Sequence, residues 1–463
     1  MRTTVTRRSG IVSVAAPASK SASHRYLVGA ALAPGVSRVR NTLESRDLER
    51  TRAILRAAGA TVNALPDGWE VSGMTIPRGG DEAGGALSCD VHESGTTCRL
   101  LTAVLAAGKG FFHIHGAGRM HERPIGELVH ALVRLGAEVR FERKPDCPPL
   151  ILHARGLDPA RCGGSLRIGM NVSSQYFSGL LLAGPLAAAP LTLEVAGDRA
   201  VSWPYVGLTL QCLEDFGIDV RVETRSDVHS AWRRNTVQGC RAVAAVRPGC
   251  LRVTVRPSKY RAGDYLVEGD WSGASYLLAA GALGRGPVRV EGLREDSPQG
   301  DRIFLDILRS MGARVETGPG AVTVFPSGLR AVDVDMGSCP DLVPTVAVLA
   351  AFAKGASRLY NAAHLRVKES DRIAAPAAEL RKAGIVVEEK ADGLVVRGVY
   401  PDRPRLAGDA VFSAHNDHRI AMSLALLGLG RPDGALDMEA RLDDPSVVAK
   451  SFPQFWDIWR QIA

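Results

Sequence analysis

Hydrophobic and polar positions along this chain fall into two alternating kinds of segment. The first kind has the pattern Leu-x-x-x-Gly-x-x-Val, in which an amphipathic stretch ends near a glycine and a stretch containing valine follows. Glycine closes many helices, so this pattern predicts a helix that stops at the glycine and a strand that begins near the valine. The pattern occurs at residues 55–62, 132–139, 213–220, 308–315 and 380–387, and a further amphipathic helix without a strand is predicted at 451–463.

The second kind of segment is apolar on all sides. Each member begins with Ser, Asp, Asn or Gly-Thr, which are suited to cap the free N–H groups of a helix. Small and apolar residues then continue without a polar face, which predicts a helix buried in the protein. These segments are 19–35, 94–110, 173–184, 270–286, 341–355 and 416–430, with short alternating strands such as 111–118 and 251–257 between helices.

Together the two kinds of segment form a β/α unit that recurs six times at a spacing of about 70 to 95 residues. A quasi-linear solenoid is one arrangement of such units, but terminal caps are not evident and the units are long for a solenoid. Two globular domains of three units each fit a chain of 463 residues better. The predicted fold class is therefore α/β, in two domains.

Composition narrows the function without deciding it. The chain is 46% hydrophobic and 23% charged, as in ordinary globular proteins, and no apolar run approaches the roughly 20 residues of a membrane span. The eight cysteines form no C-x-x-C pair, so we expect neither a metal site nor a disulfide framework. The beginning of the sequence lacks a secretory apolar core, and we expect a cytoplasmic protein. The net charge of +8 is scattered over a chain with 5% aromatic residues, which favours small acidic substrates over nucleic acid.

Basic residues recur where helices begin, although the partial positive charge of a helix N-terminus disfavours cations there. One such residue alone is most simply a solvated surface charge. The recurrence instead predicts sites for phosphate and carboxylate, which helix N–H groups, arginine forks and lysine ammonium groups bind well. These residues are Lys20, Arg25, Arg123, Lys368, Arg372, Arg419 and Lys450.

Neutral and acidic side chains occupy the same helix starts. Each Ser or Asp is most simply a helix cap, but as a group the neutral ones also suit the recognition of substrate hydroxyls. Asp341 and Glu369 lie among the cations, where they act either in proton transfer or as salt-bridge partners of Lys and Arg. The neutral residues suited to hydroxyls are Ser173, Ser174, Gln175 and Ser202, while Ser21 and Gly95 stand at the starts of two further helices of this kind.

The ordered motifs resemble one known family. The resemblance is carried, in the family's order, by the stretches SKS–HR, SGTTCR, RMHERPI, SSQY, SWPY, VEGDWSGASY, RVKESDR, NDHR and AKSFP. The family is that of the 3-phosphoshikimate 1-carboxyvinyltransferases, also called EPSP synthases, and the resemblance runs from about residue 11 to the C-terminus. The resemblance implies two domains, each a threefold repeat of a β/α unit (an inside-out α/β barrel), with the active site in the cleft between them. It places residues 1–19 and 264–463 in one domain and 20–263 in the other. It also implies a cytoplasmic monomer that needs no metal or organic cofactor.

The resemblance further implies substrates and site residues. The family transfers the enolpyruvyl group of phosphoenolpyruvate to the 5-hydroxyl of shikimate 3-phosphate, and Lys20, Asp341 and Glu369 would be catalytic. The residues implied for shikimate 3-phosphate are Lys20, Ser21, Arg25, Ser173, Ser174, Gln175, Ser202, Asp341 and Lys368. Those implied for phosphoenolpyruvate are Lys20, Gly95, Arg123, Gln175, Arg372, Arg419 and Lys450. Glyphosate would compete with phosphoenolpyruvate beside Gly95.

Several positions depart from the commoner bacterial pattern of the family without touching the catalytic set. They are His24, Glu93, Ser94, Leu100, Trp203, His364 and a longer segment at 225–260. The nearest alternative function is that of the sister enzyme that adds enolpyruvate to a UDP-amino sugar. That family has Lys-Asn at the position of Lys20-Ser21 and a catalytic cysteine in a loop that here reads GRMHERPI. The scattered charge and few aromatic residues disfavour a nucleic-acid-binding protein. None of the matched charged residues is missing, which disfavours an inactive structural relative.

Overall fold

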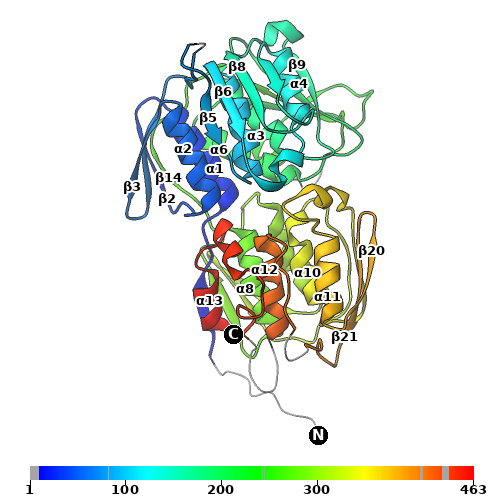
Figure 1. The fold of residues 1–463 in the computed structure, drawn as a ribbon. Coiled ribbons are helices and arrows are strands. Elements are labelled where there is room, and N and C mark those ends of the chain that lie inside the picture. The colour runs from blue at the N-terminus through cyan, green and yellow to red at the C-terminus, as the bar shows by residue number, and fades with distance from the viewer. Residues whose placement is uncertain (1–9, 82, 242, 244–245, 407–409, 430–436) are drawn as a thin grey trace. The chain divides into compact units, whose positions relative to one another are not determined.

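The computed structural model describes residues 10–81, 83–241, 243, 246–406, 410–429 and 437–463. Its contacts divide the chain into an N-terminal unit, residues 18–267, and a C-terminal unit formed by residues 1–17 and 268–463 (Figure 1). The expected boundaries were 19/20 and 263/264. The boundaries in the structure are instead 17/18 and 267/268. Ser19 belongs to the N-terminal unit because it caps the first helix of that unit, and β14 (Asp264–Leu266) belongs there because it pairs in parallel with β2 (Val36–Arg40). Residues 242, 244–245 and 430, in the predicted segments 225–260 and 416–430, lie outside the described residues.

The six apolar segments form buried helices, as predicted. Ser19, Ser94, Asp270 and Asp417 cap four of them, each accepting a backbone N–H with its side chain. Asp341 does not cap: it lies in the 3-10 turn η5 (Pro340–Leu342), and the helix begins after it. The helices are α1 (Lys20–Leu32), α3 (Gly95–Ala106), α5 (Gln175–Ala183), α8 (Trp271–Leu283), α10 (Val343–Ala351) and α12 (His418–Ala425).

The predicted amphipathic helices are also present. They are α2 (Arg46–Ala57), α4 (Gly126–Arg134), α6 (Trp203–Asp215), α9 (Phe304–Ser310), α11 (Ala374–Lys382) and α13 (Phe455–Ile462). The glycine after each of the first five has a φ between +72° and +120°, a conformation that residues with a β-carbon rarely adopt. The strands that follow are β3 (Thr61–Leu65), β7 (Glu138–Phe141), β11 (Val220–Thr224), β16 (Arg314–Gly318) and β20 (Val386–Lys390).

Five sheets of the described residues share one plan, in which a parallel pair of strands is extended by antiparallel strands. The N-terminal unit holds three sheets, which are β14-β2-β4-β3, β5-β6-β8-β7 and β9-β10-β13-β11-β12. The C-terminal unit holds β1-β15-β17-β16 and β18-β19-β21-β20. The strands not yet placed are β1 (Val12–Ala15), β4 (Gly68–Ser72), β5 (Leu87–Asp90), β6 (Lys109–His115), β8 (Leu150–Arg155), β9 (Ser165–Gly169), β10 (Leu191–Ala196), β12 (Arg233–Asn235), β13 (Leu251–Val255), β15 (Val288–Glu291), β17 (Ala321–Phe325), β18 (Asp333–Asp335), β19 (Lys354–Tyr360) and β21 (Gly393–Val399).

Strand β1 completes a sheet whose other strands lie far from it in the sequence. It pairs in parallel with β15, in a register that runs from Val12 opposite Val288 to Ala15 opposite Glu291. The polypeptide therefore passes from the C-terminal unit into the N-terminal unit and back again. The longer segment at 225–260 adds the short edge strand β12 beside β11.

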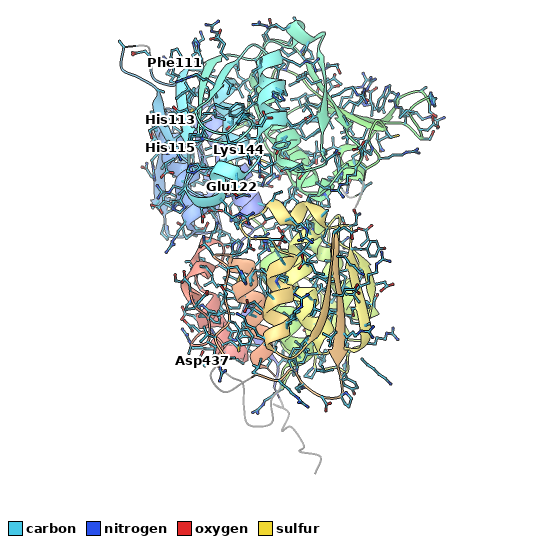
Figure 2. The ribbon with its side chains drawn as sticks, turned by 45° about the vertical axis from the view of Figure 1, so that its right-hand side comes forward. Phe111, His113, His115, Glu122, Lys144 and Asp437 are labelled. Carbon is cyan, nitrogen blue, oxygen red and sulfur yellow. The ribbon has the colours of Figure 1, made fainter. Side chains whose placement is uncertain are left out.

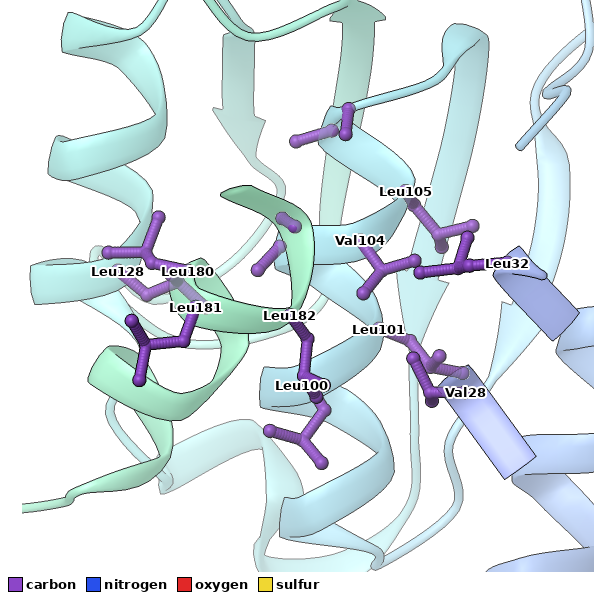
Figure 3. Packing of buried hydrophobic residues seen from close by; sticks show 14 of the residues in the cluster. Val28, Leu32, Leu100, Leu101, Val104, Leu105, Leu128, Leu180, Leu181 and Leu182 are labelled. Carbon is purple, nitrogen blue, oxygen red and sulfur yellow. The ribbon is translucent and has the colours of Figure 1, made fainter. Parts of the chain in front are cut away.

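The core of the N-terminal unit holds the buried helices close together. Leucine and valine side chains of α1, α3 and α5 interlock there (Figure 3). Helices α3 and α5 approach so closely that a β-carbon on Gly179 would stand 2.9 Å from the carbonyl oxygen of Arg99. This close contact lets the polar residues at the starts of α3 and α5 meet.

The sheets present one face to this core and one face to the surroundings. On β6, Phe112 and Ile114 are buried, whereas Phe111, His113 and His115 project from the opposite face (Figure 2). This alternation is the one expected of a half-buried strand. Every helix in the described part of the chain falls short of the length and apolar character that a membrane span requires.

Candidate active site

Lysine 20 lies at the first position of α1 and is held by an acidic residue of α2. Lys20 Nζ is 2.5 Å from Asp47 Oδ2, and both side chains are largely buried. Ser45 caps α2, so Asp47 stands in the first turn, where a carboxylate also complements the helix dipole. The pairing fixes the Lys20 ammonium group at the start of α1.

Arginine 25 lies one turn further along α1 and is 1% exposed. Its guanidinium donates to Thr209 Oγ1 at 2.7 Å, to the carbonyl oxygen of Ser21 at 2.8 Å and to that of Tyr205 at 2.8 Å. Burial lowers the pKa of Arg25 to about 10, which still leaves the group cationic near neutral pH. Arg25 thus ties the start of α1 to the start of α6.

Glycine 95 and arginine 123 share one space at the start of α3. Arg123 Nη1 donates to the carbonyl oxygen of Glu93 at 2.9 Å, which lays the guanidinium over Gly95. A β-carbon on Gly95 would stand 2.7 Å from Cζ of Arg123. The absence of a side chain at Gly95 therefore allows Arg123 to reach the helix N-terminus.

Glutamine 175, the first residue of α5, connects to α3. Its Nε2 donates to Thr96 Oγ1 at 2.9 Å, and its Oε1 accepts from Arg99 Nη1 at 2.9 Å. Ser173 Oγ accepts the backbone N–H of Gln175 at 3.2 Å. These contacts bring the predicted residues of α3 and α5 together.

Two further predicted serines are buried beside helix starts. Ser174 precedes α5 and is 3% exposed, and Ser202 precedes α6 and is 6% exposed. Neither makes a side-chain capping bond to its helix. Ser202 has a left-handed backbone, with φ of 56°, which is uncommon for a residue with a β-carbon.

Arginine 372 is the centre of the cluster in the C-terminal unit. Its Nη1 lies 2.8 Å from Asp341 Oδ1, its Nη2 2.6 Å from Glu369 Oε2, and its Nε 2.7 Å from Asp417 Oδ2. Burial alone would lower the pKa of Arg372, but the charges of Asp417, Glu369 and Asp341 outweigh burial and raise it. One guanidinium therefore orients three carboxylates.

Two more predicted cations adjoin the same carboxylates. Arg419 Nη2 donates to Asp341 Oδ2 at 2.8 Å, so that Asp341 bridges two arginines. Lys450 Nζ lies 4.0 Å from Glu369 Oε1. Lys368 directly precedes Glu369 in the chain and is partly exposed. All of the site residues predicted on this side thus belong to one cluster or its immediate chain neighbourhood.

Sequence reasoning missed the partners that orient these groups. Asp47, Arg99 and Asp417 were not among the candidate site residues, yet they bind Lys20, Gln175 and Arg372. For Asp417 and Asp47 the available signal was a position at a helix start. That position alone does not separate a capping carboxylate from one that also binds a cation, because capping satisfies the same pattern.

The residues at the starts of α1, α3 and α5 and the cluster around Arg372 have the chemistry of anion-binding sites that also contain carboxylates. In the C-terminal unit, fixed guanidinium and ammonium groups lie against carboxylates that are largely shielded from solvent. Such cations position phosphate and carboxylate groups, and the shielded carboxylates can exchange protons with a bound substrate.

Comparison with known proteins decides the family. The model of the family described as EPSP synthase (3-phosphoshikimate 1-carboxyvinyltransferase) matches residues 3–244 and 241–459. The chain belongs to the EPSP synthase family. A 3-phosphoshikimate 1-carboxyvinyltransferase of Thiobacillus denitrificans is 40% identical over 462 residues, covering 99% of this chain and 97% of that protein. One of Syntrophobacter fumaroxidans is 39% identical over 464 residues, covering both chains completely.

Solved structures agree with this membership. An EPSP synthase from Acinetobacter baumannii has a TM-score of 0.71 at 25% identity, covering 97% of this chain and 95% of that one. The enolpyruvyl transferase NikO from Streptomyces tendae shares the fold, with a TM-score of 0.70 at 20% identity, covering 98% and 95%. The expected α/β fold of the enolpyruvyl transferases, in two units, is confirmed, and the EPSP synthase relatives do not favour the UDP-amino-sugar alternative.

Proposed function

We propose that this EPSP synthase transfers the enolpyruvyl group of phosphoenolpyruvate to the 5-hydroxyl of shikimate 3-phosphate. The products are 5-enolpyruvylshikimate 3-phosphate and phosphate. The observation that carries this proposal is the cluster in which Arg372 joins Asp341 and Glu369, with Arg419 and Lys450 alongside. It combines cations for two anionic substrates with carboxylates for proton transfer.

Shikimate 3-phosphate has a phosphate, a carboxylate and free hydroxyls to be recognised. The buried serines before α5 and α6 suit the hydroxyls, and the cations at the start of α1 suit the phosphate and carboxylate. Arg25 contributes through its charge and through the order it imposes on α1 and α6. The proposed contacts are Lys20, Ser21, Arg25, Ser173, Ser174, Gln175, Ser202, Asp341 and Lys368.

Phosphoenolpyruvate has a phosphate and a carboxylate on three carbons, and it needs several cations at once. The guanidinium of Arg123 over Gly95 and the cations of the Arg372 cluster match that need. The proposed contacts are Lys20, Gly95, Arg123, Gln175, Arg372, Arg419 and Lys450.

The reaction consists of an addition followed by an elimination. Asp341 takes the proton of the 5-hydroxyl as its oxygen bonds to C2 of phosphoenolpyruvate, while Glu369 or Lys20 delivers a proton to C3. A proton then leaves C3 and the C2–O bond to phosphate breaks, which restores the double bond and releases phosphate. Because C2 gains cationic character while the substrate groups remain anionic, fixed Arg and Lys side chains keep the reacting atoms in place.

Phosphate release tests the function directly. The purified protein should release phosphate with both substrates and not with either one alone. Replacing shikimate 3-phosphate by a UDP-amino sugar tests the sister activity in the same assay. No release above background with both proper substrates would overturn the proposal.

We also propose that the protein acts as a cytoplasmic monomer and requires neither metal nor organic cofactor. Unchanged phosphate release after treatment with a chelator and gel filtration would support the absence of a metal or organic cofactor. Light scattering at working concentration tests the monomeric state, and a dimeric mass would contradict it.

A further inference from the structure

A fourth carboxylate of the C-terminal unit lies beside the Arg372 cluster without contacting Arg372. Asp301 is in the 3-10 turn η4 (Gly300–Ile303) and is 2% exposed. Its Oδ2 accepts the hydroxyl of Ser272, whereas its buried Oδ1 has no hydrogen-bond partner among the described residues. Ionising a buried carboxylate with one unsatisfied oxygen costs free energy of folding, so a structural role alone does not explain an acidic residue here.

Helix α8 connects Asp301 to the proposed catalytic base. Ser272 and Tyr276 are four residues apart on α8 and therefore lie on the same face of the helix. Ser272 contacts Asp301, while the hydroxyl of Tyr276 lies 3.4 Å from Arg419 Nη1. Arg419 in turn donates to Asp341 at 2.8 Å. The two carboxylates thus adjoin the same face of one helix.

The charge at Asp301 is adjustable near neutral pH. Burial is the main cause that raises the pKa of Asp301 to about 7, the charge of Asp341 raises it further, and Arg419 opposes both. Because electrostatic coupling is reciprocal, an ionised Asp301 also disfavours the ionised form of Asp341.

We propose that Asp301 is a positioning residue whose negative charge strengthens Asp341 as the base that takes the proton of the substrate hydroxyl. The inference rests on the function proposed above. Two arginines stabilise ionised Asp341, which by itself makes Asp341 a weak base. A negative charge at Asp301 counteracts the arginines, and its loss leaves Asp341 weaker.

The other groups that face Asp301 do not change charge in the same range. Burial raises the pKa of Tyr276 to about 12 and that of Cys339 above its usual range, so both stay neutral near pH 7. Asp270, which caps α8, adds a negative charge that raises the pKa of Asp301, and Arg419 remains cationic. Within this set, Asp301 is the group that titrates around neutrality.

The test is the pH dependence of kcat for the full-length enzyme, measured by phosphate release with both substrates saturating. In the wild type, kcat should rise as pH increases through about 7. Asp301→Asn keeps the shape and an acceptor for Ser272 but stays neutral. Its kcat should therefore remain at the acid-side value, roughly 3- to 10-fold below the wild type at pH 8.5, with both KM values nearly unchanged.

Two further variants make the comparison specific. Ser272→Ala removes a hydrogen bond that favours ionised Asp301, so the rise in kcat should move to higher pH while the plateau is kept. Asp306→Asn changes an exposed carboxylate of the adjacent helix α9 and should follow the wild type. The substrate phosphates also titrate near pH 6, but they do so alike in every variant.

The outcomes separate this inference from the proposed function. A wild-type pH profile in Asp301→Asn, or an equal loss of kcat at every pH, would overturn the role of Asp301 while leaving the function intact. If Asp301→Asn does not fold, an unshifted profile in Ser272→Ala overturns the role as well. Absence of phosphate release by the wild type would overturn both proposals.

Discussion

The guanidinium of Arg123 occupies the space that a side chain on Gly95 would fill. A β-carbon there would stand 2.7 Å from Cζ of Arg123, whose Nη1 is anchored on the carbonyl oxygen of Glu93. The two positions are therefore coupled, and a side chain introduced at Gly95 must first displace the guanidinium of Arg123.

Gly95→Ala should raise the KM for phosphoenolpyruvate because the new methyl group displaces Arg123. Glyphosate should compete with phosphoenolpyruvate in the wild type, and its inhibition constant should rise more than the KM does, as the family resemblance implies. Steady-state inhibition at several phosphoenolpyruvate concentrations measures both effects. A wild type insensitive to millimolar glyphosate would contradict the second expectation.

The double variant Gly95→Ala/Arg123→Ala shows whether the effect passes through Arg123. If it does, Gly95→Ala should add little in the background that already lacks the guanidinium, because coupled positions are not additive. Fully additive losses would show that the methyl group acts on the ligand directly.

Asp341→Asn should lower kcat by about 10²- to 10⁴-fold, the usual contribution of a positioned base. Arg372 and Arg419 remain in place, so binding of phosphoenolpyruvate should change far less. If Asp341 serves only as their salt-bridge partner, the variant should instead lose thermal stability and keep a nearly normal kcat. Kinetics, phosphoenolpyruvate binding and thermal unfolding of one preparation distinguish these results.

His24 should make the N-terminal unit less stable in acid. The His24 ring is 1% exposed and its Nδ1 lies 2.8 Å from Thr51 Oγ1. Burial is the main cause that lowers the pKa of His24 from 6.5 to about 3, with Lys20 adding to it. Between these values the unfolded chain binds more protons, so stability falls as pH drops below 6.5. His24→Asn should flatten that slope in urea unfolding measured between pH 7.5 and 4.5.

Asp301 should act on stability with the opposite sign. Its folded-state pKa is raised from 3.8 to about 7, so the folded protein binds the proton more tightly than the unfolded chain does. The contribution of protonated Asp301 to the free energy of unfolding is fully present below pH 3.8 and is lost as pH rises through 7. Asp301→Asn should remove this loss from the unfolding of the C-terminal unit, and an unchanged slope would contradict the raised pKa.

Leu101→Ala should destabilise the N-terminal unit by about 2–5 kcal/mol, because it opens a cavity between α1 and α3. Leu101 is 1% exposed and packs in the core shown in Figure 3. Leu266→Ala is the matched control, since that side chain is 72% exposed and should cost little. Denaturant unfolding of both variants measures the difference, and equal losses would contradict the packing argument.

The repeated helices could be predicted because each carries its own local signal. Gly59 and Gly136 illustrate this: the predicted helix stop is the residue with positive φ, as backbone sterics require. Local signals fail where partners are distant in sequence. Asp341 was expected either to transfer protons or to pair with nearby Lys and Arg, but nothing local in the sequence specifies Arg372 and Arg419 as its partners.

The partners of Arg25 also could not be predicted from the sequence. A cation at a helix start predicts a charge for a ligand, and the structure adds that Arg25 also donates within the protein, to Thr209 Oγ1 and to the carbonyl oxygens of Ser21 and Tyr205. Two of these partners come from α6, far along the chain, and only the packing of α1 against α6 brings them to Arg25. A residue type and its position predict that a charge is present, whereas tertiary packing decides what the charge touches.

The pairing of β1 with β15 has a consequence for how the protein is made. During synthesis, β1 leaves the ribosome before its partner exists, since about 270 residues separate the two strands. At roughly 5–20 residues per second, β1 waits on the order of half a minute with an unpaired edge. The N-terminal unit can be completed earlier, once β14 has emerged to pair with β2. The strand that is synthesised first is thus among the last to find its place, and the C-terminal unit matures only when the oldest part of the chain returns to it.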